Sequence, residues 1–173
     1  MKECRFQLTY IADGQLHRTC GKAQEQQPFE TEHFSLMTQY DKGRVRVRIL
    51  PKEPVSFTQF EMVFRYPYQP DSRVFVNGYQ SWTDSKEYFV TDRMTHLSPL
   101  SKPWIKEMSL DKSGDYTFHV YPKTSGVFHG YSYSYVRNGE TVDLFGSITE
   151  RSGYTVFNFD CNRNLLIVEK DLE

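Results

Sequence analysis

RVRVRI, residues 44–49, places an arginine and an aliphatic side chain at alternate positions. Successive side chains of a β-strand point to opposite faces, so this alternation predicts a strand with one basic and one apolar face. A basic row can bind an anion, but it is more often the solvated face of an antiparallel strand. We therefore predict that the arginines face solvent and that Val45, Val47 and Ile49 contribute to a core.

The same period of two recurs along most of the chain. Residues 5–10 alternate polar and apolar side chains, and so do residues 131–135. Phe60, Met62 and Phe64 share one face of a further segment and join the predicted core. Closely spaced strands of this kind are typical of a β-sandwich.

Interruptions of the alternation mark bulges and turns. Val55 and Phe57 are out of phase with the apolar set that follows them, which predicts a bulge or break near Thr58. Residues 137–140, Arg-Asn-Gly-Glu, have the composition of a tight hairpin turn. Residues 162–164, Asn-Arg-Asn, predict another turn.

Residues 77–114 break the pattern. They show little clean alternation, and Pro99 and Pro103 interrupt them. A long irregular segment inside a compact domain is usually functional or packs against another part of the protein. Because no window predicts a long amphipathic helix, the expected fold is an all-β, mainly antiparallel, supersandwich-like β-sandwich with a long irregular excursion over 77–114.

Composition narrows the classes of partner. The chain carries 21 basic and 22 acidic residues with no block of either sign, so we expect no nucleic-acid partner. The start, MKECRFQLTY, lacks the apolar run of a signal peptide, and no segment has membrane-spanning length. We therefore expect a cytoplasmic protein with no membrane partner.

Aromatic residues make up 16% of the chain, and they favour strands.

Cysteines and histidines show no metal-binding pattern. Cys4, Cys20 and Cys161 are an odd number with no close pair, which predicts reduced thiols. The five histidines are dispersed, without the spacing of a zinc site. We predict no metal site and no cofactor.

VFVNGYQSWTDS, residues 74–85, contains the strongest candidate for a binding site. Asn77 and Gly78 tolerate the positive φ of a sharp turn, and Tyr79, Gln80 and Trp82 follow directly. Flat aromatic rings beside hydrogen-bonding side chains suit a sugar, which has apolar C–H faces and a rim of hydroxyls. The alternative is that Trp82 fills a core, since most tryptophans are largely buried.

The segment VNGYQSW, residues 76–82, resembles a motif of the N-terminal β-domain of bacterial alpha-galactosidases of the melibiase type, which are related to the raffinose synthases. The resemblance extends over the whole chain, including YSYSYVRNGETVDLFGSI at 131–148. It implies a β-sandwich followed by a (β/α)₈ barrel that supplies two catalytic aspartates. The matching position of the motif's last tryptophan, which lines the galactose pocket, is Trp82. Asn77, Tyr79 and Gln80 are the expected supporting substrate-binding residues.

The catalytic part of such an enzyme is not in this chain. A barrel of that type takes about 250 residues, and no βαβ alternation is found before Glu173. We predict that residues 1–173 form one non-catalytic N-terminal domain of a longer enzyme. A retaining glycosidase needs two facing carboxylates about 5–5.5 Å apart. Asp84, Glu87 and Asp92 lie near the motif, but their expected position in a loop and the resemblance both argue against such a pair, so we predict no catalytic residue among them. The partners that the resemblance implies are the barrel of the same parent chain, a galactoside in the intact enzyme, and further copies in a homo-oligomer.

Two other functions stay open on the sequence. An autonomous carbohydrate-binding β-sandwich would use exposed aromatic residues as a platform for sugar rings. A lipocalin-like barrel would hold an apolar ligand, although the proline-interrupted excursion fits that fold poorly. An autonomous module binds sugar alone, whereas an accessory domain requires the barrel.

Overall fold

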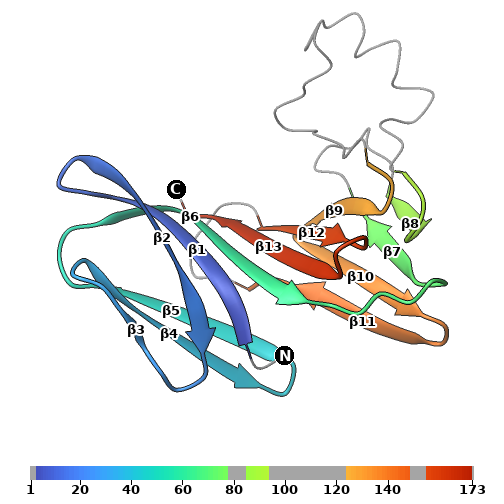
Figure 1. The fold of residues 1–173 in the computed structure, drawn as a ribbon, viewed down its shortest axis with the longest axis horizontal. Helices are drawn as coiled ribbons and strands as arrows, with labels where there is room; N and C mark the ends of the chain where they lie inside the picture. The colour runs from blue at the N-terminus through green and yellow to red at the C-terminus, as the bar shows by residue number, and fades with distance from the viewer. Residues whose placement is uncertain (1–2, 78–84, 94–123, 149–154, 173) are drawn as a thin grey trace, which may run out of the picture. The chain divides into compact units, whose positions relative to one another are not determined.

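The computed structural model describes residues 3–77, 85–93, 124–148 and 155–172. These described residues form β-strands and no helix, so the predicted all-β, antiparallel fold is confirmed. They divide into two compact units, one of residues 3–65 and 167–172 and the other of residues 66–77, 85–93, 124–148 and 155–166. We describe the two units separately (Figure 1).

The first unit holds the strands β1 Glu3–Ala12, β2 Gln15–Gln24, β3 Phe29–Glu30, β4 Phe34–Asp41, β5 Arg44–Pro51 and β6 Ser56–Arg65. Antiparallel β1 lies between β2 and β6, and a second sheet has the order β3-β4-β5. Phe6, Leu8 and Tyr10 of β1 are buried, as their alternation predicts. Phe60, Met62 and Phe64 of β6 are buried too, so this part of the predicted core is confirmed.

Strand β6 has a β-bulge at Thr58, which allows both Phe57 and Phe60 to be buried although their positions are out of phase. Thr9 pairs with Gln59 and Tyr10 pairs with Phe57, which leaves Thr58 as the extra residue. The Thr58 hydroxyl donates a hydrogen bond to the Thr9 carbonyl at 3.2 Å. Because the bulge shifts the alternation by one position, Phe57 is buried together with the apolar set that follows it.

The arginines of β5 are exposed, as predicted, but the opposite side of the strand is only half-buried. Val45, Val47 and Ile49 therefore contribute less to the core than their alternation indicates. The reason is position, since β5 is the edge of its sheet and has a neighbour on one side only, β4.

The second unit holds β7 Arg73–Val76, β8 Lys86–Phe89, β9 Val127–Tyr131, β10 Tyr133–Asn138, β11 Thr141–Gly146 and β12 Thr155–Asp160. Its four-stranded antiparallel sheet has the order β11-β10-β7-β8, and β12 pairs with β9 (Figure 1). The predicted hairpin is confirmed, with β10 and β11 joined by Gly139 and Glu140, and Gly139 at φ 59°. The predicted turn at 162–164 is also found, and β13 Leu165–Asp171 follows it and runs on into the first unit.

Strand β8 lies inside the segment that we expect to be irregular. Residues 86–89 pair with β7 along their whole length, from Val76 opposite Lys86 to Arg73 opposite Phe89. Four residues are too few for their alternation to stand out from a loop in the sequence. The excursion therefore contains a strand, while residues 78–84 and 94–114 lie outside the described residues.

The run of alternating tyrosines is not one strand. Ser132 adopts φ 65°, a left-handed conformation uncommon for residues other than glycine, and separates β9 from β10. Tyr131 pairs with Val156 of β12, whereas Tyr133 pairs with Gly146 of β11. One residue thus transfers the chain from one sheet to another.

Candidate functional site

Asn77 is the one predicted substrate-binding residue that the structure describes. It follows β7 directly and is 9% exposed. Its side-chain Oδ1 accepts a hydrogen bond from the Tyr131 backbone N–H at 2.6 Å, and its Nδ2 donates one to the Tyr131 carbonyl at 3.0 Å. The amide therefore pairs with a backbone in the way that a neighbouring strand would, and it fixes the point at which the chain leaves β7.

Tyr79, Gln80 and Trp82 lie outside the described residues, so their roles stay predictions. Asp84 lies outside them as well. Asp92 is described, and its Oδ2 accepts a hydrogen bond from the Phe89 backbone N–H at 2.9 Å, which closes the turn after β8.

One face of the β11-β10-β7-β8 sheet gathers aromatic, aliphatic and charged side chains. Side chains of directly opposite residues in antiparallel strands lie on the same face. By this register, the face carries Val142 and Leu144 of β11, Tyr133, Tyr135 and Arg137 of β10, Arg73 and Phe75 of β7, and Glu87 and Phe89 of β8. The opposite face is the buried one, since Val74, Val76 and Val136 are fully buried.

Aromatic rings stack in the middle of the exposed face. The rings of Phe75 and Tyr135 are 4.9 Å apart with an interplanar angle of 8°, and those of Phe75 and Tyr133 are 6.0 Å apart at 16°. Parallel rings at this separation cover each other's flat sides. The stack therefore stabilises the sheet and covers part of these ring faces, although Tyr133 is still 52% exposed.

Glu87 is the centre of a charged network on the same face. Its Oε1 accepts hydrogen bonds from the Tyr135 hydroxyl at 2.7 Å, from Arg137 Nε at 2.9 Å and from Arg137 Nη2 at 2.6 Å. Its Oε2 lies 3.7 Å from Arg73 Nη1. Partial burial alone would raise the pKa of Glu87, but the hydrogen bonds from Tyr135 and Arg137 and the arginine charges outweigh burial and hold that pKa below its usual range.

This lowered pKa argues against acid catalysis by Glu87. A general acid of a glycosidase needs a raised pKa to keep its proton near neutral pH. A carboxylate between two guanidinium groups is instead a fixed negative charge that orients both of them.

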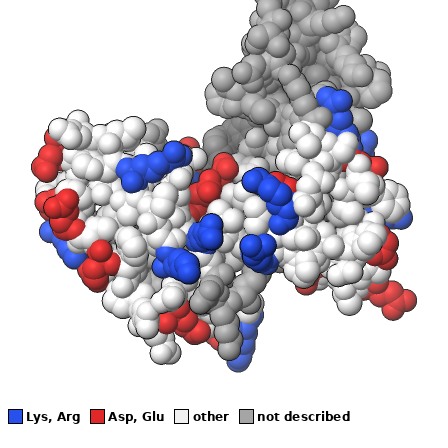
Figure 2. All heavy atoms as spheres, viewed as in Figure 1, with Lys and Arg blue, Asp and Glu red and all other residues white. Residues whose placement is uncertain are grey.

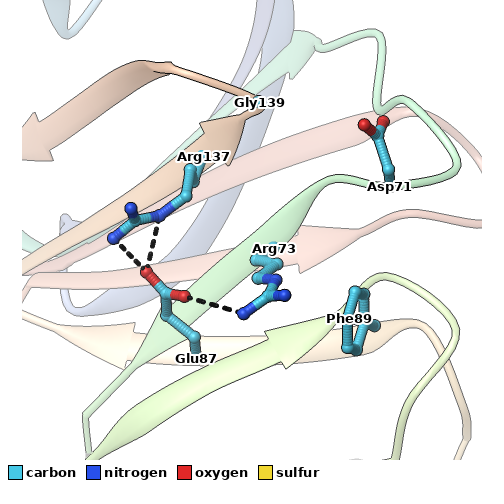
Figure 3. A pocket seen from close by; sticks show the side chains of 6 residues that line it. All are labelled: Asp71, Arg73, Glu87, Phe89, Arg137 and Gly139. Atoms are coloured by element: carbon cyan, nitrogen blue, oxygen red, sulfur yellow. Dashed lines mark hydrogen bonds and ion pairs between the residues drawn. The ribbon is translucent and has the colours of Figure 1, made fainter.

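A hollow of about 430 Å³ opens beside this network. Figure 3 shows Glu87 between Arg137 and Arg73, with Phe89 next to Arg73 and Asp71 apart from them in the segment before β7. The lining residues are Asp71, Arg73, Glu87, Phe89, Arg137 and Gly139. The Arg73 guanidinium lies over the Phe89 ring at 4.4 Å from its centroid, a cation–π contact that holds both side chains.

A separate cluster in the first unit surrounds His33, which is buried. Its Nδ1 pairs with Glu53, and its Nε2 lies 3.2 Å from Glu32. The Tyr10 and His17 rings pack around it at centroid distances of 5.5 and 5.1 Å. The hydrogen bond with Glu53 raises the pKa of His33, so protonation strengthens the pair.

Other kinds of site find little support in the part of the chain that the structure describes. There, no group of three His, Cys, Asp or Glu side chains is placed to hold a metal ion. The cysteines are free thiols, and burial raises the pKa of Cys161 to about 12, which keeps it protonated at neutral pH. Acidic and basic side chains are interspersed on the face seen in Figure 2. The described residues include no helix with the length and apolarity to span a membrane.

Sequence reasoning did not find the Glu87 network. Its arginines and its carboxylate lie on three strands, and the strand that carries Glu87 was not predicted. The signal available was the alternation of Glu87 and Phe89 with Lys86 and Tyr88, which is too short to decide the structure alone.

Comparison of the chain with known protein families, with curated proteins and with solved structures found no match.

Proposed function

We propose that this chain is the non-catalytic N-terminal β-domain of an alpha-galactosidase-like glycoside hydrolase, and that the segment after β7 forms one wall of the sugar pocket. Two observations support the proposal. The first is the VNGYQSW motif at 76–82. This motif carries the argument. The second is that both polar atoms of Asn77 bind the Tyr131 backbone, so the residue near the start of the motif is held in one position.

In this proposal the domain positions an aromatic residue and performs no chemistry. Trp82 covers one face of the galactose ring or donates its indole N–H to a hydroxyl. Asn77 supports the base of this segment by binding the Tyr131 backbone. It does not itself contact the sugar in this proposal, because it is nearly buried. The barrel of the parent chain supplies two aspartates, and hydrolysis of a galactoside proceeds through a covalent glycosyl-enzyme intermediate.

The proposed setting follows from the same resemblance. The parent is an exo-acting enzyme for galactosides of the melibiose and raffinose type, it acts in the cytoplasm, and it assembles as a homo-oligomer. Its partners are the barrel and the galactoside, and it needs no cofactor.

An autonomous carbohydrate-binding module is the second candidate. The observation in its favour is the exposed face of the β11-β10-β7-β8 sheet, on which Tyr133 is 52% exposed and Phe89 is 44% exposed. The stacking of Phe75 with the tyrosines weighs against it, since those rings cover one another.

The Trp82→Ala substitution tests the first proposal. In the intact enzyme it should reduce kcat/KM for galactosides by at least about tenfold, while the free energy of unfolding of residues 1–173 changes by less than about 0.5 kcal/mol. Translation of the gene downstream of residue 173 should show a barrel with two catalytic aspartates. A stop codon there, or unfolding of the isolated domain by the substitution, would contradict the proposal. Sugar binding by residues 1–173 that is lost in the same variant would favour the autonomous module.

A further inference from the structure

The hollow beside Glu87 has the charge balance of a site for an uncharged ligand. Its charged lining consists of two guanidinium groups, those of Arg73 and Arg137, and two carboxylates, those of Asp71 and Glu87. The formal charges cancel. A phosphate ion entering the hollow would meet two carboxylates, and a divalent cation would meet two guanidinium groups, so neither sign of ion is favoured.

The lining has hydrogen-bond acceptors and hydrogen-bond donors that are not used by other described residues. Among the described residues, nothing forms a hydrogen bond or ion pair with Asp71, and Glu87 Oε2 has only the contact with Arg73 at 3.7 Å. Each guanidinium has five N–H donors. Arg137 uses two of its nitrogens on Glu87, and Arg73 uses one in the 3.7 Å ion pair. Acceptors and donors thus lie side by side on β7, β8 and β10, and the carboxylate of Asp71 adds a further acceptor apart from them, in the segment before β7 (Figure 3).

Four of the lining side chains, those of Arg73, Glu87, Phe89 and Arg137, are also held in place before any ligand arrives. Tyr135 and Arg137 fix the Glu87 carboxylate through Oε1, and Phe89 supports the plane of the Arg73 guanidinium. Side chains that are already ordered lose little conformational entropy when they bind. The Phe89 ring, 44% exposed, adds an apolar surface beside the polar groups.

We propose that this hollow binds a neutral polyhydroxyl ligand, a hexose or a short neutral oligosaccharide. Vicinal hydroxyls donate and accept at neighbouring atoms, which matches alternating carboxylates and guanidinium groups. The C–H face of a sugar ring is apolar and matches Phe89. A volume of about 430 Å³ lies within the range of small-molecule sites.

This second site extends the sugar chemistry of the proposed function, but it uses other residues and does not require the barrel. The two proposals therefore fail independently. Loss of galactoside turnover in the intact enzyme reports on Trp82, whereas sugar binding by residues 1–173 alone reports on the hollow.

Titration of residues 1–173 with glucose, galactose and melibiose, followed by NMR chemical shifts or calorimetry, tests the inference. Asp71→Ala is the decisive variant. Asp71 forms no hydrogen bond or ion pair with a described residue, so the substitution removes no such interaction from the fold. We expect at least about tenfold weaker sugar binding in Asp71→Ala. Asp41→Ala removes an exposed carboxylate in the first unit and should bind as the unsubstituted chain does. Circular dichroism should show that both variants are folded.

Each possible result decides the question. Sugar binding that Asp71→Ala weakens, and that Asp41→Ala and Trp82→Ala leave unchanged, supports the hollow as the site. Binding that persists in Asp71→Ala overturns the inference, and so does the absence of binding for all three sugars. Preferential binding of inorganic phosphate or of Mg²⁺ in a way that depends on Asp71 also overturns it, because the charge argument would then be wrong.

Discussion

Replacement of Asn77 by alanine should release the end of β7 from Tyr131. The side chain makes two hydrogen bonds with the Tyr131 backbone, at 2.6 and 3.0 Å, and is nearly buried. A typical hydrogen bond contributes about 1 kcal/mol net to stability, so we expect Asn77→Ala to cost about 2 kcal/mol. If that energy governs local opening, the Tyr131 amide should exchange with solvent about 30-fold faster.

Hydrogen exchange of the Tyr131 amide and urea unfolding are the two measurements. Gln39→Ala, which removes an exposed strand amide, is the control and should change neither. Asn77→Asp is a second variant that tests the same contacts. It keeps the acceptor for the Tyr131 N–H, but it replaces the donor Nδ2 by an oxygen that faces the Tyr131 carbonyl. At neutral pH this variant should be less stable than Asn77→Ala, and the difference should shrink in acid, where the new carboxyl group can donate. Unchanged exchange and stability in Asn77→Ala would refute the proposed role of this side chain.

Two further predictions concern the first unit. The hydrogen bond with Glu53 raises the pKa of His33, so its contribution to stability is complete below about pH 6.5, the ordinary histidine value, and is lost as the pH rises through the raised folded-state pKa. Urea unfolding across this range should show the decline, and His33→Asn should abolish it. A Cβ on Gly21 would lie 2.7 Å from a Phe29 ring carbon, so Gly21→Ala should cost about 1–3 kcal/mol. Gly146→Ala, where no described atom lies within 4 Å of the new methyl group, is the control, and equal stability of the two variants would contradict the packing argument.

Local patterns of the sequence predict much of the fold. The period of two identifies β1, β5 and β6 because it depends only on which side of a strand each residue faces. The phase shift before Thr58 predicts the bulge for the same reason. The Asn-Gly pair at 138–139 predicts the β10–β11 hairpin, since a tight turn needs a residue that accepts positive φ.

Features that depend on long-range pairing were not predictable in this way. Glu87 meets Arg73 and Arg137 only because β8 and β10 both pair with β7. The break at Ser132 follows from the different partners of β9 and β10, while the alternation continues through it unchanged. Val45 has the pattern of a core residue, but the position of β5 at the edge of its sheet leaves it half-buried.

Strands β5 and β11 lie at edges of two different sheets and differ in a way that matters for handling the protein. Outward-facing arginines at 44, 46 and 48 give β5 a charge that repels another copy of itself. Strand β11 is one edge of the β11-β10-β7-β8 sheet and has neither lysine nor proline; its charged side chain is Asp143, and its Leu144 is 72% exposed. Copies of the chain in concentrated samples should therefore associate through β11 more readily than through β5. Leu144→Lys is the first substitution to make for solubility.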